Sequence, residues 1–310
     1  MRNDLMTLSG SRVPLLLIAA LLALALPAAD RATDRDHDGI DDAVEDALLS
    51  RYAPVVLLHP TEPVHPSSTE WLLARAELEP AGNSPRTLQA SVLGALATLA
   101  WPQVESPSAR LHAYDPVLEG SRDPHDWAVY GHAFRAAGGG VILQYWFFYP
   151  YNRAYGLFDH GGDWEHVAVK LDAALRPEGA FYARHEDSHP GEWFGWDVLR
   201  KEGDHPVVLA GRGTHASYAT RDDAPFWERL CEADLPSGAA AAHCDVWRTG
   251  SDGAGVVNVG ERSAPRVGFI TWPGRWGATG RFGEDSRTAS PPGPAFQGGW
   301  CSGGAPGACP

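Results

Sequence analysis

The second half of the chain constrains the fold most, because it consists of short segments that favour β-strands. From Trp127 onward these segments are rich in β-branched and aromatic residues, and Gly, Pro or Asp separates them; they read WAVYGHAF, GVILQYWFFYP, WEHVAVKLD, GAFYARHE, HPVVLAG and RVGFITW. Since no regular helices are expected between them, a parallel α/β sheet is disfavoured. The sequence therefore predicts a mostly β fold, an antiparallel β-sandwich with short helical decorations.

The first half is expected to supply the helices. A short helix is predicted over Asp42 to Tyr52, where Pro54 stops it, and a strand over PVVLLH follows. A second helix is predicted from Ser67 to Leu78, which has a capping hydroxyl and helical spacing. The segment TLQASVLGALATL is either another helix or a strand followed by a loop.

The N-terminal segment has the layout of a secretory signal peptide. Arg2 and Arg12 precede the apolar run VPLLLIAALLALALPAA, whose small residues near Ala28 and Ala29 are typical of a cleavage site. The alternative is a single membrane anchor. We predict a signal peptide over 1–29, a calcium loop and the start of a helix over 30–50, a sandwich over 51–300, and a disulfide-tethered tail over 301–310. The protein is then secreted, extracellular or periplasmic, without a transmembrane span after cleavage.

Charge and cysteine content narrow the possible partners. The formal net charge is −14, which disfavours binding to nucleic acid and to anionic lipid. We expect a monomer. The four cysteines are even in number, which in an exported protein favours disulfides, and no CxxC pair points to zinc. Three connectivities are possible, of which Cys231–Cys244 with Cys301–Cys309 needs the least topology.

The segment DRDHDGIDDAVE has the spacing of a calcium-binding loop. Calcium takes six to eight oxygen ligands, and Gly39 stands at position 6, where such a loop turns sharply. Position 8, which is usually apolar in a paired EF-hand, is Asp41, so the loop is closer to the unpaired calcium loops of secreted proteins. The alternative is an acidic, solvated linker. The predicted ligands are Asp34, Asp36, Asp38, the carbonyl of Ile40, Asp42 and Glu45.

A second group of polar residues surrounds the stretch DHGGDWEHVAVKL. Alternation places Asp163 and Glu165 on the same strand face as the apolar Val167, Val169 and Leu171. Two carboxylates there cost several kcal/mol to desolvate unless a cation lies between them. A divalent ion (magnesium, calcium or manganese) is one solution, with Asn152, His160, Asp163 and Glu165 as ligands. The alternative is a network in which Arg153 or another cation pairs the acids.

The same residues carry a resemblance to a known family. YWFFYPYN followed by HGGDWEHV resembles the core of the necrosis-inducing (Nep-like) family, whose hallmark reads GHRHDWE. The resemblance implies a secreted β-sandwich with a metal held by Asn152, His160, Asp163 and Glu165. Gly162 replaces the second histidine of that motif, and Asn152 stands where the family has an aspartate, which removes one charge.

A longer resemblance runs from about Arg51 to Trp300, to the vacuolar protein sorting-associated protein 62 family. Its matching segments are LSRYAPVVLLHPTEPVHPSSTEW, YWFFYPYN, HGGDWEHVAVKL, VVLAGRGTHASY and GRWG…PPGPAFQGGW. This resemblance implies a fold and a metal site, and no reaction.

Three functions remain open from the sequence. The first is a toxin-like protein that recognises a polar headgroup or glycan, such as a cell-surface glycolipid, as the necrosis-inducing resemblance implies. The second is a metal-dependent hydrolase of an ester or phosphodiester, with His215 or His185 as catalytic candidates. The third is an interaction protein with structural metals. Four tryptophans beside glycines, Trp193, Trp196, Trp272 and Trp276, are candidates for sugar stacking, although most tryptophans are expected in the core.

Overall fold

The protein is described here from a computed structural model, which covers residues 33–79, 86–87, 108–184, 191–231, 244–283 and 287–304. The signal peptide, the segment over 88–99, His185, His189 and Cys309 lie outside these residues. Among the residues described, no helix combines the length and the apolar character needed to cross a membrane.

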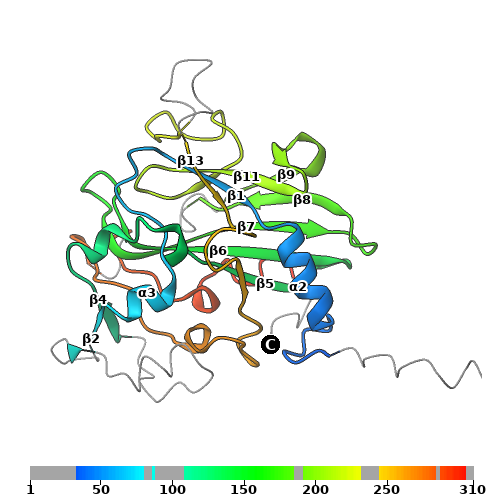
Figure 1. The fold of residues 1–310 in the computed structure, drawn as a ribbon, viewed down its shortest axis with the longest axis horizontal. Helices are drawn as coiled ribbons and strands as arrows, with labels where there is room; N and C mark the ends of the chain where they lie inside the picture. Colours follow the sequence, from blue (N-terminus) through cyan, green and yellow to red (C-terminus); the bar gives the residue numbers. More distant parts are fainter. Residues whose placement is uncertain are drawn as a thin grey trace, which may run out of the picture. The chain divides into compact units, whose positions relative to one another are not determined.

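The described part is mostly β, as predicted, and its strands form three sheets (Figure 1). A six-stranded sheet has the order β14-β5-β6-β7-β8-β9, a five-stranded sheet has the order β10-β11-β1-β13 with β12 beside β11, and a small sheet has the order β3-β2-β4. The strands are β1 (Val55–Leu58), β2 (Glu77–Glu79), β3 (Arg86–Thr87), β4 (Arg110–His112), β5 (Val129–Arg135), β6 (Val141–Asn152), β7 (His160–Leu171), β8 (Pro177–Tyr182), β9 (Glu192–Gly195), β10 (Lys201–Glu202), β11 (His205–Ala210), β12 (Ser217–Tyr218), β13 (Asp245–Arg248) and β14 (Val256–Asn258).

Most neighbouring strands are antiparallel, with two exceptions among the pairs described. β1 runs parallel to β11, and β14 runs parallel to β5. The two long strands β6 and β7 form the centre of the larger sheet, with Tyr149 opposite Asp163 and Asn152 opposite His160. This register brings the YWFFYPYN and DWE segments side by side.

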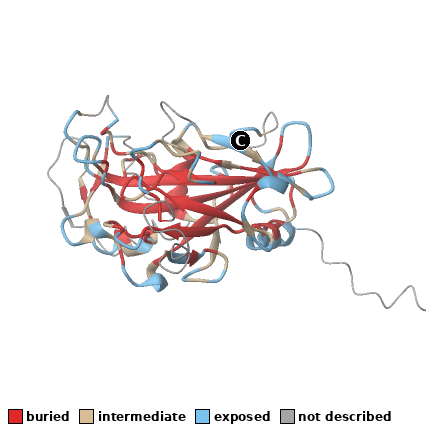
Figure 2. Cartoon of the chain, turned by 90° about the horizontal axis from the view of Figure 1, so that it is seen from above, coloured by how far each residue is buried: buried red, intermediate tan, exposed pale blue. Residues whose placement is uncertain are grey.

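The larger sheet is covered on both faces, so its strands are buried almost throughout (Figure 2). One face packs on the five-stranded sheet through a core that includes Val56, Val208 and Trp247. The other face packs on the C-terminal part of the chain through an aromatic core; this core includes Trp146, Phe148, Trp164, Phe269, Trp272 and Trp276. The alternation predicted for β7 is confirmed, because Val167, Val169 and Leu171 lie in the first core and Trp164 lies in the second.

The helices are short. They are α2 (Asp42–Arg51) and α3 (Thr69–Leu73), with 3-10 turns η1 (Val117–Glu119), η2 (Pro124–Asp126), η3 (Trp196–Val198), η5 (Gly268–Thr271) and η6 (Pro294–Phe296). Asp41 caps α2 by accepting from the backbone N–H groups of Ala43 and Val44. Leu48 and Leu49 then dock α2 on the core between the sheets.

Two sequence predictions of secondary structure are wrong. The helix predicted over Ser67 to Leu78 ends at Leu73, because Glu77–Glu79 pairs with β4 as a strand instead. The strand predicted over RVGFITW is the 3-10 turn η5, whose Phe269 packs edge-on against Tyr130 at a centroid distance of 4.9 Å. In both segments tertiary contacts override the local preference.

Candidate binding cavity and metal sites

A cavity of about 920 Å³ opens where β7 extends beyond the end of β8. The four predicted ligands of the central metal site, Asn152, His160, Asp163 and Glu165, all line it. Two stretches remote in sequence from β7 contribute as well, one around Thr214 to Glu228 and one around Arg287 to Gly298. Its volume lies in the range of sites for small organic ligands.

Asp163 on β7 has an internal cation as partner. Asp163 lies 2.7 Å from Nδ1 of His215, and Glu62 lies 3.5 Å from the Nε2 of the same ring. The second distance is that of an ion pair rather than of a hydrogen bond. His215 is buried and stacks on Tyr149 with ring centroids 3.8 Å apart. The sequence alternative of an internal cation is therefore met by His215 for Asp163, and no described contact joins His215 to Glu165; Arg153 contacts the Tyr151 ring instead.

The charge of His215 follows from competing effects. Burial lowers the pKa of the ring, but the hydrogen bond to Asp163 and the charge of Glu62 outweigh it and raise the pKa to about 9. At neutral pH the ring is an imidazolium between two carboxylates. Because both ring nitrogens face carboxylates and the ring is not on the cavity wall, this geometry gives no support to His215 as a catalytic base.

Asn152 and His160 form a pair at the end of the same two strands. His160 Nδ1 donates to the carbonyl of Gly162 at 2.8 Å, which leaves Nε2 to accept from the Asn152 amide at 3.0 Å. The Oδ1 atom of Asn152 is buried without a hydrogen-bond partner. An amide oxygen and an imidazole nitrogen are thus present beside two carboxylates, a donor set that suits a divalent ion.

The central residues share a cavity wall without forming a compact cluster. In the described chain, the groups of three His, Cys, Asp or Glu ligand atoms within 4.8 Å of one another include neither Asp163 nor Glu165. The residue types and their common cavity fit a divalent ion; their present spacing does not.

The N-terminal loop, in contrast, contains two compact acidic groups that are able to hold a metal ion. The first is Asp34, Asp36 and Asp38, and the second is Asp36, Asp42 and Glu45; in each, the ligand atoms lie within 4.8 Å of one another. A third group contains His132, Glu261 and Cys301, but Cys301 is disulfide-bonded and offers no thiolate. The predicted disulfide Cys231–Cys244 is present.

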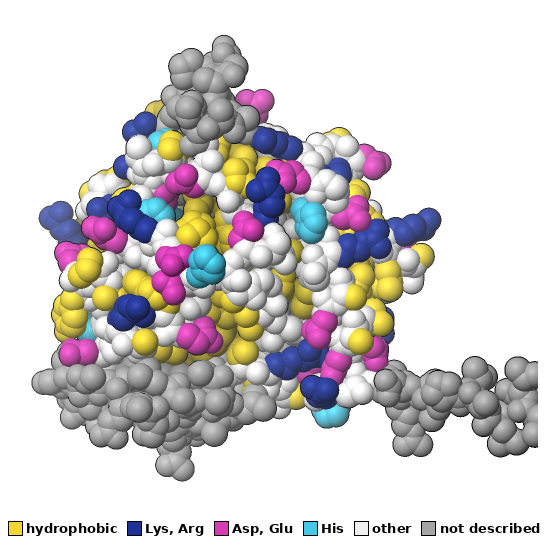
Figure 3. Space-filling view, in the orientation of Figure 1, with side chains coloured by type: hydrophobic (Ala, Val, Ile, Leu, Met, Phe, Trp, Pro, Cys, Tyr) yellow, Lys and Arg dark blue, Asp and Glu magenta, His cyan; other side chains and the backbone are white. Residues whose placement is uncertain are grey.

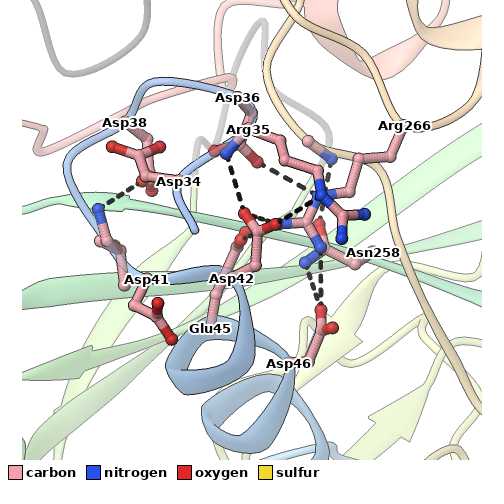
Figure 4. A network of polar contacts seen from close by, with 12 residues as sticks. Asp34, Arg35, Asp36, Asp38, Asp41, Asp42, Glu45, Asp46, Asn258 and Arg266 are labelled. Atoms are coloured by element: carbon pink, nitrogen blue, oxygen red, sulfur yellow. Dashed lines mark hydrogen bonds and ion pairs between the residues drawn. The ribbon is translucent and has the colours of Figure 1, made fainter. Parts of the chain in front are cut away.

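The loop acids are buried beside Arg266 (Figure 4). Burial raises the pKa of Asp36, raises that of Asp38 to about 6, and raises that of Glu45 to about 8. Nearby acids add to these shifts, and Arg266 partly offsets those of Asp36 and Glu45. No sequence pattern pointed to Arg266 or to Glu62, since Arg266 lies far along the chain from the acids that it faces and Glu62 lies far from His215.

The tryptophan candidates divide between surface and core. Trp193 on β9 is 47% exposed, whereas Trp272 and Trp276 are buried in the aromatic core, so the surface placement considered for these two is wrong. The exposed aromatics that do line the cavity are Tyr155, Phe158 and Trp227, which were not predicted. On the face shown in Figure 3, acidic and basic side chains are interspersed.

The backbone at Gly162, the position of the second histidine in the necrosis-inducing motif, leaves no room for a side chain. Its φ is +66°, and an added Cβ would lie 2.7 Å from the carbonyl atoms of Trp276. We expect Gly162→Ala to lower the free energy of unfolding by about 2–4 kcal/mol, combining backbone strain with overpacking. Gly156→Ala is the control, with φ +73° and open space around the Cβ, and is expected to cost about 1 kcal/mol in urea denaturation. Equal losses in the two variants would refute the packing argument.

Comparisons with known proteins place the chain near necrosis-inducing proteins only loosely. No family model and no curated protein matches the chain, so the resemblance to the vacuolar protein sorting-associated protein 62 family finds no support. Similar solved structures include NLPPya in complex with mannosamine, at 15% identity over 80% of this chain and 84% of that one, with a TM-score of 0.37. NLPPya in complex with glucosamine has 17% identity over 63% and 73%, with a TM-score of 0.35. Necrosis and Ethylene inducing Protein 2 from the causal agent of cocoa's Witches Broom disease has 17% identity over 54% and 76%, with a TM-score of 0.30. Likeness at this level carries no argument about function.

Proposed function

We propose that this is a secreted protein that binds a glycan or another polar headgroup in the cavity beside β7. The observation that carries the proposal is the composition of the cavity wall. It joins buried carboxylates, Asp163 and Glu165, to the exposed aromatic rings of Tyr155, Phe158 and Trp227. Aromatic faces stack on the apolar faces of sugars, and a few polar groups fix their hydroxyl or amino groups.

The cavity residues have separate roles in this function. Glu165 and Asp163 accept hydrogen bonds from a sugar, and they favour a cationic amino group over a neutral hydroxyl. His215 fixes the orientation of Asp163 through the 2.7 Å contact. The predicted divalent ion at Asn152, His160, Asp163 and Glu165 stays a separate proposal: these side chains would have to move closer together to hold it, and it would compete with a cationic amino group for the two carboxylates.

Calcium binding by the N-terminal loop and secretion belong to the same proposal. We infer that the N-terminal loop binds calcium, supported by the two compact acidic groups around Asp36. Its role is structural, because the loop adjoins α2 and not the cavity wall. Secretion rests on the apolar N-terminal run that follows Arg12.

The test of the binding function is calorimetric titration of the protein with glucosamine, mannosamine and glucose, each with and without a divalent ion. Glu165→Gln is expected to weaken amino-sugar binding about tenfold, since it removes a charge-assisted hydrogen bond. Glu178→Gln serves as the control, because Glu178 lies on β8, pairs with Lys170 and is not on the cavity wall. Binding that is unchanged in Glu165→Gln would refute the assignment of this cavity.

A further inference from the structure

The five acids predicted as calcium ligands in the N-terminal loop share one pattern of hydrogen bonds and ion pairs. Each has one carboxylate oxygen engaged by the protein. Asp34 Oδ2 accepts from the backbone N–H of Gly39 at 3.1 Å, and Asp38 Oδ1 accepts from that of Ile40 at 2.6 Å. The corresponding oxygens of Asp36, Asp42 and Glu45 face the guanidinium of Arg266.

The second oxygen of every one of these acids is left over. These atoms are buried and have no hydrogen-bond partner; they are Asp34 Oδ1, Asp36 Oδ1, Asp38 Oδ2, Asp42 Oδ2 and Glu45 Oε1. Asp42 Oδ2 has one ion-pair contact, 3.2 Å from Nε of the exposed Arg35. Asp36 is 1% exposed and Glu45 is fully buried, so bulk solvent does not reach these oxygens. Unpaired carboxylate oxygens at this depth call for a cation.

Arg266 reaches the loop from a distant part of the chain. Its backbone N–H donates to the carbonyl of Val259 at 2.9 Å, on the segment that follows β14. From there Nη2 lies 2.8 Å from both Asp42 Oδ1 and Glu45 Oε2, and Nε lies 3.4 Å from Asp36 Oδ2. Figure 4 shows the guanidinium turned toward the side chains of α2 and of the loop before it.

The planar guanidinium makes this arrangement possible. It directs five N–H donors along fixed directions, whereas a lysine ammonium is a compact point charge. Asp36, Asp42 and Glu45 each offer one oxygen within 4.8 Å of the others, and each also keeps a second oxygen that Arg266 does not engage. The three acids therefore have enough oxygens to face the arginine and a metal ion at the same time.

We propose that Arg266 is the positioning residue of the calcium site, holding Asp36, Asp42 and Glu45 in the orientation that the ion requires. This inference rests on the proposed calcium binding of the loop. The ion and Arg266 together then join the N-terminal segment to the segment after β14. A hydrogen bond from Asn258 on β14 to Asp46 on α2, 2.7 Å long, lies beside this junction.

The test separates positioning from charge by keeping the charge constant. Calcium affinity is measured by isothermal titration of chelator-treated protein, for the wild type, for Arg266→Lys and for Arg35→Lys. Arg266→Lys is expected to weaken calcium binding about tenfold, the usual cost of losing a group that orients metal ligands. Arg35→Lys is the matched control, since Arg35 also contacts Asp42 but has a side chain that is 76% exposed. Its affinity is expected to stay within about twofold of the wild type.

The possible results distinguish calcium binding by the loop from the positioning role of Arg266. If wild type does not bind calcium, the loop is not a calcium site and both proposals fail. If wild type binds and Arg266→Lys binds equally well, calcium binding stands and the positioning role is overturned.

Thermal unfolding in saturating calcium shows whether Arg266→Lys is folded. If it is not folded, Asp46→Glu replaces it, since this change keeps the charge but displaces the carboxylate that lies 3.1 Å from Arg266 Nη1, and Asp46 supplies none of the five leftover oxygens. Weaker calcium binding in Asp46→Glu then supports the positioning role, and unchanged binding overturns it.

Discussion

Replacing His215 by alanine is expected to lower the free energy of unfolding by about 3–5 kcal/mol, the usual cost of removing one partner from a buried ion pair. The change leaves Asp163 and Glu62 buried without their cation, although Glu62 keeps hydrogen bonds from the backbone N–H groups of Val64 and Gly213. It also removes the ring that stacks on Tyr149. Urea denaturation measures the loss.

The control for this prediction is His125→Ala. The His125 side chain is 91% exposed and pairs with Asp123 at the surface, so its removal is expected to change stability by less than about 0.5 kcal/mol. A loss below about 1 kcal/mol in His215→Ala would contradict the view that His215 is the cation between Asp163 and Glu62.

The stability contributed by His215 also has a defined pH dependence. Its folded pKa is about 9, above the ordinary value of 6.5, so the folded protein holds this proton more tightly than the unfolded chain. The contribution is therefore fully present below pH 6.5 and is lost as the pH rises through 9. In His215→Ala the free energy of unfolding, measured against pH, should lack this decrease between pH 6.5 and 9.

Removing calcium is expected to make stability depend strongly on pH through the N-terminal loop. Burial raises the folded pKa of Glu45 from 4.5 to about 8, so the metal-free folded protein binds a proton that the unfolded chain releases. That contribution is present below pH 4.5 and is lost as the pH rises through 8, an effect on the order of 4 kcal/mol. Calcium replaces the proton, so calcium-loaded protein should lack this decline.

Thermal unfolding between pH 5 and pH 8, with chelator and with calcium, measures this effect. The melting temperatures should diverge as the pH rises, because calcium stabilises most where Glu45 would otherwise be a buried anion that Arg266 neutralises only in part. Glu45→Gln removes the contribution of Glu45 and should make the chelated curve less steep, while Asp36 and Asp38 still titrate. Identical pH dependence with chelator and with calcium would show that the loop does not bind the ion.

The sequence predicted the strands and the loop where local pattern and tertiary structure agree. In β7 the alternation of Val167 and Val169 with Trp164 correctly predicted which side chains share a face of the strand, because each face packs in a different core. The helix α2 was predicted over Asp42 to Tyr52 with Pro54 as its stop signal, and the structure has it over Asp42–Arg51. In the loop, ligand spacing along one short segment is itself the signal.

The sequence could not predict features that depend on contacts between distant segments. His215 follows β11 and Glu62 follows β1, and the parallel pairing of these two strands is one of the tertiary arrangements that bring both residues to Asp163. Trp272 and Trp276 resemble loop residues by their glycine neighbours, yet Trp276 packs on Phe148 and Trp164, and Trp272 packs on Trp276. The distances between the side chains of Asn152, His160, Asp163 and Glu165 likewise depend on the tertiary structure around β7.

The most direct test of the central claim is a crystal structure of the protein soaked with glucosamine at a concentration that calorimetry shows to be saturating. The proposed function predicts sugar density in the cavity, with its amino group at Asp163 or Glu165 and its ring against Tyr155, Phe158 or Trp227. Density at another surface, with this cavity holding solvent alone, would contradict it.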